Sequence, residues 1–379
     1  MAETTGLTTS AGAMRALAER WLRVRGDAAG GDGERGGVDG DFVCSPAGLW
    51  LALAAVTAGA RGRTAAELEA ALGLGDTPAG TAAVVTDSAR ALARTGQLGV
   101  ATRVWSRTPV HPAYREALPD IGFGPMDPAG IDVWVREATG GLIERLPVEI
   151  DQNSLLALVN VLALKARWTT PFPGHRTADL PFTDAAGEVT AVPTMRQSLP
   201  SPAGWTVNGA QVVELRCEGG ESAVRVRFVL GEEGARAADV LPAAWVPDQD
   251  RTALDAEVIG LELPRLELRT LTDVTPHLAA FGISYATSPD ADFSGLSPEP
   301  LAIDQVVQEA VVKVAELGVE AAAVTAIAMR AAGAPRPRRV ARIAFDRPFG
   351  VVVLDATDGA PLFTAWQSSA PNLKAPLAG

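Results

Sequence analysis

Helical and strand-like patterns occupy different parts of this chain, and their separation limits the folds that it can adopt. Apolar residues recur at helical spacing in residues 14–22 and again in residues 131–146. Beyond residue 180, short strands bounded by turns prevail, and a helix is expected only around residues 274–283. Because the sequence lacks regular strand–helix–strand alternation, we predict an α+β fold in one domain over residues 1–379.

Local signals place several elements. Ser45-Pro46 opens an apolar helix, and Thr64 with Glu67 three places later has the spacing of a capping box, which predicts a second helix from about Ala65. Alternating or unbroken apolar residues predict strands within seven segments: 98–106, 154–168, 181–195, 223–231, 261–271, 305–316 and 349–359.

The composition excludes some classes of function. The chain has 379 residues, and 47% of them are hydrophobic, so we expect a large core. Because its net charge is -12, we expect no binding to nucleic acid or to an anionic membrane. Without a secretory signal or a run of membrane-spanning length, the protein is expected to be cytoplasmic. Cys44 and Cys217 lack metal-ligand spacing and are expected to be buried thiols, so no metal site is predicted.

Residues suited to catalysis are few. Only His111, His175 and His277 could act as a histidine general base, and none lies beside a nucleophile motif. The sequence contains no GxSxG elbow, no GxxxxGK(S/T) phosphate loop, no HExxH pair and no GxGxxG turn between a strand and a helix. We therefore expect that the protein is not an enzyme.

Six segments, in order along the chain, resemble the motifs of the serpin family of protease inhibitors. They are FVCSPAGLWLALAAVTAGARGRTAAEL (42–68), IDVWVREATGGLIERL (131–146), LALVNVLALKARWTTPF (156–172), PFTDAAGEVTAVPTM (181–195), ADFSGLS (291–297) and FDRPFGVVVLDATDGAPLF (345–363). Each motif alone is weak, but six in family order are specific. The resemblance implies three β-sheets, about eight or nine helices and an exposed reactive loop at roughly residues 316–340, in a bacterial-type, inhibitory member.

The resemblance assigns ELGVEAAAVTAIAMR, residues 316–330, to the hinge and first part of the reactive loop. By position, the hinge residues are Glu316, Gly318, Val319, Glu320, Ala321, Ala322, Ala323 and Thr325. In inhibitory members of the family, a protease cuts this loop and is held as an acyl-enzyme. The cut loop then inserts into the main sheet as a new strand and carries the protease with it.

The hinge segment has a composition that suits such a strand, because alternate residues of a strand face opposite sides. One face would carry Val319, Ala321, Ala323, Thr325, Ile327 and Met329, none of which is charged. The other face would carry Glu320, Ala322, Val324, Ala326, Ala328 and Arg330, which include both charges. Burial of the first face therefore desolvates no charge. Taken alone, the alanine-rich segment would also suit an exposed helix.

The family's usual loop length, counted from the hinge glycine, places the cut between Ala332 and Gly333. Such a bond favours an elastase-like or subtilisin-like protease with a small primary pocket. A cut between Arg330 and Ala331 would instead suit a trypsin-like enzyme. The basic stretch at residues 336–339 is either a solvated flank of the loop or a positive exosite.

By resemblance, the residues that control opening of the main sheet are Ser45, Asn160, Trp168 and Gln308. Gln308 stands where the family commonly has histidine, and Gly48 where serine is common. Because glutamine both donates and accepts hydrogen bonds, a polar network remains possible without the pH dependence of histidine. Val319 replaces the usual threonine or serine of the hinge, and this apolar, β-branched residue should still insert.

The predicted function is irreversible inhibition of a serine protease, which would be the covalent partner of this protein. We expect the inhibitor to be a monomer and to need neither a cofactor nor a heparin-type activator. The alternative is a non-inhibitory member of the family with a binding or chaperone-like role. Bulky or charged hinge residues are common in non-inhibitory members, and the small residues at 321–323 favour inhibition.

Overall fold

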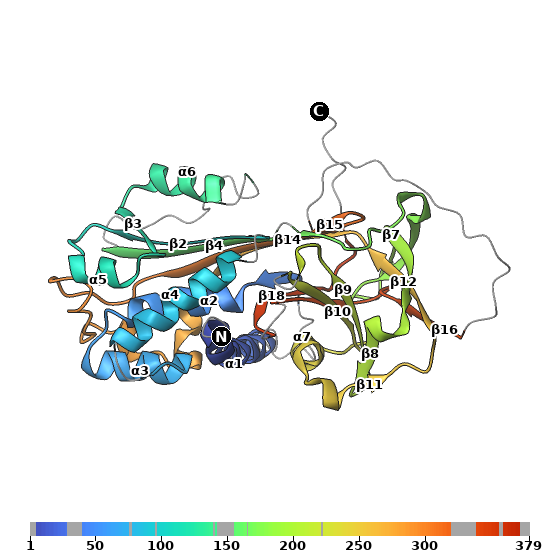
Figure 1. The fold of residues 1–379 in the computed structure, drawn as a ribbon, viewed down its shortest axis with the longest axis horizontal. Helices are drawn as coiled ribbons and strands as arrows, with labels where there is room; N and C mark the ends of the chain where they lie inside the picture. Colours follow the sequence, from blue (N-terminus) through green and yellow to red (C-terminus); the bar gives the residue numbers. More distant parts are fainter. Residues whose placement is uncertain are drawn as a thin grey trace.

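Three β-sheets and a group of helices make up the computed structural model of this chain (Figure 1). The structure describes residues 5–28, 40–75, 78–94, 97–138, 141, 155–164, 166–220, 223–319, 339–355 and 359–371, and the structural statements below concern these residues. The α-helices are α1 (Thr5–Ala28), α2 (Pro46–Thr57), α3 (Gly62–Leu72), α4 (Pro78–Arg94), α5 (Pro112–Ala117), α6 (Pro128–Ala138) and α7 (Ala237–Val240). Helices α1 to α6 precede most of the strands, which confirms the α+β class.

The first seven-stranded sheet, called the main sheet here, has the strand order β3-β2-β4-β14-β15-β5, with β13 also paired to β14. Its strands are β2 (Leu98–Ser106), β3 (Gly122–Pro125), β4 (Leu156–Leu164), β5 (Ala166–Arg167), β13 (Leu266–Asp273), β14 (Val306–Ala315) and β15 (Gly318–Val319). Figure 1 shows α6 on one side of this sheet and helices α2 to α4 on the other.

The other two sheets lie beside the main sheet (Figure 1). The second has the order β1-β18-β17-β10-β9-β8-β11 and the third the order β16-β12-β7-β6. Their strands are β1 (Phe42–Cys44), β6 (Ala178–Thr183), β7 (Val189–Pro200), β8 (Gly204–Val207), β9 (Ala210–Arg216), β10 (Arg225–Leu230), β11 (Thr252–Ala253), β12 (Val258–Pro264), β16 (Val340–Ala344), β17 (Phe349–Leu354) and β18 (Pro361–Gln367). Every residue of β17 and β18 is buried, which explains why these strands are apolar on both faces.

Helix α2 is enclosed by the rest of the fold. All 12 of its residues are buried, and it packs against β2, β4 and β18. Ser45 is its N-cap and accepts a hydrogen bond from the Gly48 N–H at 3.1 Å, while Pro46 occupies the first turn, where a missing N–H costs nothing. Burial on every side explains the absence of an amphipathic pattern. Among the helices described, none combines the length and the apolar character that a membrane span requires.

The capping box predicted for α3 is wrong. The helix begins at Gly62, and no side chain caps its N-terminus. Thr64 instead accepts a hydrogen bond from the N–H of Asp292 at 2.8 Å, and Glu67 accepts from the N–H groups of residues 284–286. The two polar side chains therefore tie α3 to a distant segment whose N–H groups need acceptors. The helix expected around residues 274–283 is a 3-10 helix, Thr275–Phe281.

The two cysteines are free and buried, as predicted. Burial raises the pKa of the Cys44 thiol to about 11 and that of the Cys217 thiol to about 12. Both therefore stay protonated near neutral pH, which makes them inert packing residues. The described residues contain no cluster of side chains able to hold a metal ion.

Candidate functional site

The boundary between β4 and β14, called the seam here, runs through the middle of the main sheet. The two strands are parallel neighbours from the pair Val306–Leu158 to the pair Val311–Ala163. Near the other end of β14, strand β15 lies between β14 and β5 and is antiparallel to both. Strands β4 and β14 are therefore paired directly along the seam, and β15 separates β14 from β5 at the other end of β14.

Gly318, the first residue of β15, passes very close to β5. A Cβ atom at this position would lie 2.8 Å from the Cα of Arg167 and closer still to the carbonyl oxygen of Ala166. Its φ of +154° is also rare for residues with a side chain. Any side chain at this position would collide with the backbone of β5, so only glycine fits here.

Val319 is the last described residue of the predicted loop before residues 320–338, and it is buried in β15 rather than exposed as the predicted loop bounds implied. Its side chain is 0% exposed, and it pairs with Val314 on one side and Ala166 on the other. The hinge residues Glu320, Ala321, Ala322, Ala323 and Thr325 lie outside the described residues, as do Arg330, Ala331, Ala332 and Gly333 at the two candidate cleavage bonds.

Glu316 anchors the turn between β14 and β15. The Nε of Arg265 donates to both of its carboxylate oxygens, at 2.9 and 3.0 Å, and the hydroxyl of Thr177 donates at 2.7 Å. Burial alone would raise the pKa of the Glu316 carboxyl, but the hydrogen bonds from Arg265 and Thr177 outweigh it and hold the pKa below its usual value. Sequence patterns identified Glu316 but neither of its partners.

Replacement of Glu316 by glutamine should lower the melting temperature at pH 7. A carboxyl with a lowered folded pKa stabilises the fold above its unfolded pKa of about 4.3, and this stabilisation disappears as the pH falls through the folded value. We expect Glu316→Gln to cost about 1–2 kcal/mol at pH 7, a value reduced because Arg265 is partly exposed, and the cost should shrink below about pH 4.

The matched control for this prediction is Glu267→Gln. Glu267 pairs with Lys313 on a neighbouring strand at 3.2 Å, but both side chains are about half exposed, so little change is expected. Thermal melts between pH 3 and pH 7 test the pair of variants. Equal behaviour of the two variants would show that the Glu316 contacts do not stabilise the hinge turn.

Trp168 packs against the same turn. Its indole Nε1 donates to the carbonyl of Ala315 at 2.9 Å, and its backbone N–H donates to the carbonyl of Leu317 at 3.0 Å. The side chain is 1% exposed and meets the ring of Phe228 edge-on. Trp168 and the partners of Glu316 therefore hold the turn between β14 and β15 in place.

The side chain of Gln308, which lies in β14 at the seam, binds the backbone of Ser45, the residue before α2. The amide of Gln308 accepts from the N–H of Ser45 and donates to its carbonyl, both at 2.8 Å, while the Ser45 hydroxyl donates to the carbonyl of Leu362 at 2.5 Å. Gln308 is 4% exposed. Its register partner across the seam is Asn160, whose side chain lies outside the described residues. The Gln308 amide thus binds both the N–H and the carbonyl of Ser45. Because an amide does not titrate, these two hydrogen bonds do not depend on pH.

Glu309, the next residue of β14, was not singled out from the sequence. Its side chain is 1% exposed, and one carboxylate oxygen accepts from Arg269 Nε at 2.6 Å while the other has no partner among the described residues. Burial raises the pKa of Glu309, although the hydrogen bond from Arg269 opposes the shift. Glu309 is the one charged residue in the strand-like segment 305–312, and this was the signal that could have revealed it.

Of the basic stretch at residues 336–339, only Arg339 is described. Its guanidinium pairs with the carboxylate of Asp255 at the protein surface, next to the start of β16. This residue is therefore already engaged with an acid of its own chain.

Comparison with known proteins identifies the same family throughout. A family model described as "Serpin (serine protease inhibitor)" matches residues 35–368. Among curated proteins, Serpin-Z2A of Oryza sativa subsp. japonica is 28% identical over 393 residues, covering 85% of this chain and 90% of that protein. Serpin A3-7 of Bos taurus is 32% identical over 225 residues, but that match covers 58% of this chain and about half (52%) of the relative.

Solved structures agree on the fold. Human thyroxine-binding globulin, solved in complex with thyroxine, superposes with a TM-score of 0.78 at 20% identity, over 96% of this chain and 100% of that one. Serpin48 of the insect Tenebrio molitor gives a TM-score of 0.78 at 22% identity, over 98% and 100%. The relatives named here are eukaryotic, so the expectation of a bacterial-type protein is not supported.

Proposed function

This chain belongs to the serpin family, and from that premise we propose that it is an irreversible, suicide-substrate inhibitor of a serine protease. The protease serine attacks the carbonyl carbon of the residue before the cut. The peptide C–N bond breaks, the new amine takes up a proton, and an ester joins the two proteins. Insertion of the cut loop into the seam would then trap this ester before water hydrolyses it.

The observation that carries the proposal is the position of β15. The strand enters the sheet between β14 and β5 and is antiparallel to both, so residues after Val319 can continue in the same direction between β14 and β4. Such a strand would replace the parallel contact at the seam with two antiparallel contacts, which are slightly more stable per residue. The chain thus already contains the first two residues of the proposed inserted strand.

The inward set of the loop supports the same conclusion. Val319 is buried without a charge nearby in its strand pairs, and the residues that alternate with it from Ala321 to Met329 are uncharged. A strand with these residues can enter the core face without desolvating an ionised group. Within this proposal, Gly318 provides the close approach to β5, and the contacts of Glu316 and Trp168 hold the point about which the loop turns.

The target class depends on the bond that is cut. A cut at Ala332–Gly333 suits an elastase-like or subtilisin-like enzyme, and a cut at Arg330–Ala331 suits a trypsin-like enzyme. Both bonds follow Met329, so either cut leaves the whole inward set on the part of the loop that would insert. The choice of protease is therefore independent of the trapping step.

Incubation with elastase-like, subtilisin-like and trypsin-like proteases tests the proposal. We expect a covalent complex that survives a denaturing gel, with mass spectrometry identifying the cut bond. The same cut should raise the melting temperature by at least about 10 °C, because the inserted strand adds paired and buried residues. Cleavage by every protease without a complex and without a rise in melting temperature would contradict trapping.

A second candidate function is the binding of a small ligand by a non-inhibitory serpin. It is favoured by the close superposition on thyroxine-binding globulin, a protein of this fold that was solved with thyroxine bound. This alternative predicts cleavage without a covalent complex, so the same gel distinguishes the two functions.

A further inference from the structure

A pocket lies beside Trp168, where three separate parts of the chain meet. It is lined from residues 168–170 after β5, from residues 199–203 at the end of β7 and in the 3-10 helix that follows, and from residues 214–216 at the end of β9. We call it the Trp168 pocket. The space not filled by atoms is about 800 Å³, part of which is open to solvent, and this is enough for a small organic molecule.

Backbone contacts hold the walls of the Trp168 pocket together. The N–H of Thr169 donates to the carbonyl of Arg216 at 2.9 Å, and Trp168 forms a β-bridge with Cys217. The N–H of Ser201 donates to the carbonyl of Glu257 at 3.2 Å. Because its walls are fixed by the main chain of the fold, the pocket is formed before any ligand arrives.

Most of the lining is apolar. Leu199 and Leu215 are almost fully buried, and the indole of Trp168 is 1% exposed. Pro200 and Pro202 are exposed and complete the apolar wall on the solvent side. A hydrocarbon chain or an aromatic ring placed against these side chains would be removed from water, which favours its binding.

Two charged side chains of β9, Glu214 and Arg216, also line the pocket. One carboxylate oxygen of Glu214 accepts from two nitrogens of the buried Arg227, at 3.0 and 2.9 Å, so the Glu214 charge is already compensated. The Nε of Arg216 lies 3.5 Å from the other oxygen, and this guanidinium is 76% exposed. Two guanidinium groups thus share one carboxylate, which leaves a net positive charge at the pocket.

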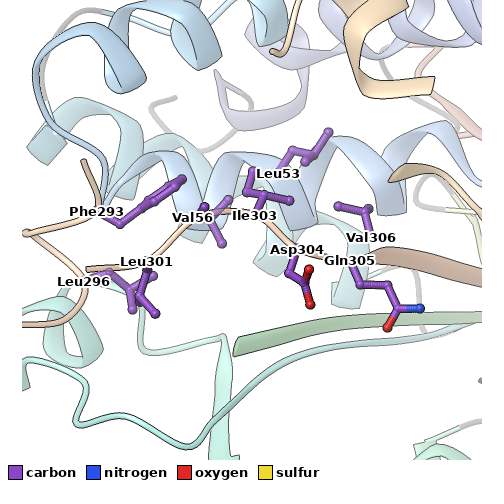
Figure 2. A pocket seen from close by; sticks show the side chains of 10 residues that line it. Leu53, Val56, Phe293, Leu296, Leu301, Ile303, Asp304, Gln305 and Val306 are labelled. Carbon is purple, nitrogen blue, oxygen red and sulfur yellow. The ribbon is translucent and has the colours of Figure 1, made fainter. Parts of the chain in front are cut away.

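A second pocket has the opposite electrostatic character. Figure 2 shows it between Leu53 and Val56 of α2 and the segment that leads into β14, with Phe293 on one side. Its one charged lining residue is Asp304, which is labelled in the same view. A negative ligand is therefore disfavoured in the second pocket and favoured in the Trp168 pocket.

We propose that the Trp168 pocket binds a small organic acid, which carries one carboxylate on an apolar body. The carboxylate would pair with Arg216, whose planar guanidinium can bind it with two hydrogen bonds. The apolar body would lie against Leu199 and Leu215. The inference goes beyond the proposed function and does not depend on it, because it requires neither a protease nor loop insertion.

Calorimetric titration of the uncut chain tests the proposal with two pairs of probes. Decanoate and 3-phenylpropanoate are the acids, and decanamide and 3-phenylpropanamide are their neutral counterparts of similar shape. We expect both acids to bind, each at least about tenfold more tightly than its amide, because only the acid pairs with Arg216. This preference should shrink as the salt concentration rises, since Arg216 is exposed.

Arg216→Gln should remove the preference for the acid while leaving binding of the amide unchanged. The matched control is Arg225→Gln, because Arg225 is the register partner of Arg216 on β10 and is not part of the pocket wall. It loses the same charge nearby and should change the affinity for the acids by less than about twofold. Both sites lie on the surface side of their strands, and thermal melts verify that the variants fold.

A rise in melting temperature provides a second measurement. A ligand that binds only the folded chain stabilises it, so saturating decanoate should raise the melting temperature of the unaltered chain but not that of Arg216→Gln. Three results would overturn the assignment. They are equal binding of acid and amide, equal losses for Arg216→Gln and Arg225→Gln, and binding that Phe293→Leu weakens but Arg216→Gln does not, which would place the ligand in the pocket of Figure 2.

Discussion

Replacement of Val319 by aspartate should turn the protein from a trap into a substrate. After insertion, residue 319 must stay in its place between β14 and β5. Its side chain is fully buried there, and aspartate is too short to reach water. Burial of the carboxylate should cost at least about 3 kcal/mol, which corresponds to about two orders of magnitude in the competition between insertion and hydrolysis of the ester.

The measurement is the number of inhibitor molecules cleaved for each protease molecule trapped. Ala322→Asp provides the matched control, because it adds the same charge to the same segment on the opposite face. We expect the control to trap the protease nearly as well as the unaltered chain. Efficient trapping by Val319→Asp would mean that residue 319 does not enter the core face, and the insertion register proposed here would then be wrong.

Replacement of Gln308 by leucine should cause the largest loss of stability among single substitutions at the seam. The amide of Gln308 is the hydrogen-bond partner of both the N–H and the carbonyl of Ser45, which is buried. Leucine can occupy a similar volume but leaves two buried backbone groups without partners. At about 1–3 kcal/mol for each group, the free energy of unfolding should fall by about 2–6 kcal/mol.

Gln197→Leu is the control for this variant. Gln197 is also buried, but its amide nitrogen has no hydrogen-bond partner among the described residues, so leucine should be neutral or stabilising there. Denaturant unfolding of both variants measures the difference. A small, equal effect at the two positions would show that the Gln308 contacts with Ser45 do not hold the sheet to α2.

Much of the fold followed from local patterns. The Ser45-Pro46 start of α2, the apolar run that became β17 and the six motifs in family order each reflect a requirement of neighbouring residues, such as a helix cap or a strand buried on both faces. The same reasoning divided residues 319–330 into a charged and an uncharged face. Local reasoning failed at Thr64 and Glu67, because their spacing suited a cap while distant N–H groups offered them better partners.

Composition, periodicity and motif order were enough to predict the α+β class, the serpin family and the uncharged face that begins at Val319. Long-range contacts, which no local pattern contains, bring Glu316 to Arg265, 51 positions away, bind Gln308 to the backbone of Ser45, and place Gly318 and Val319 between β14 and β5. The physical reason is that periodicity specifies which side of an element is apolar, whereas a hydrogen-bond partner or an unfilled space depends on which distant segments meet.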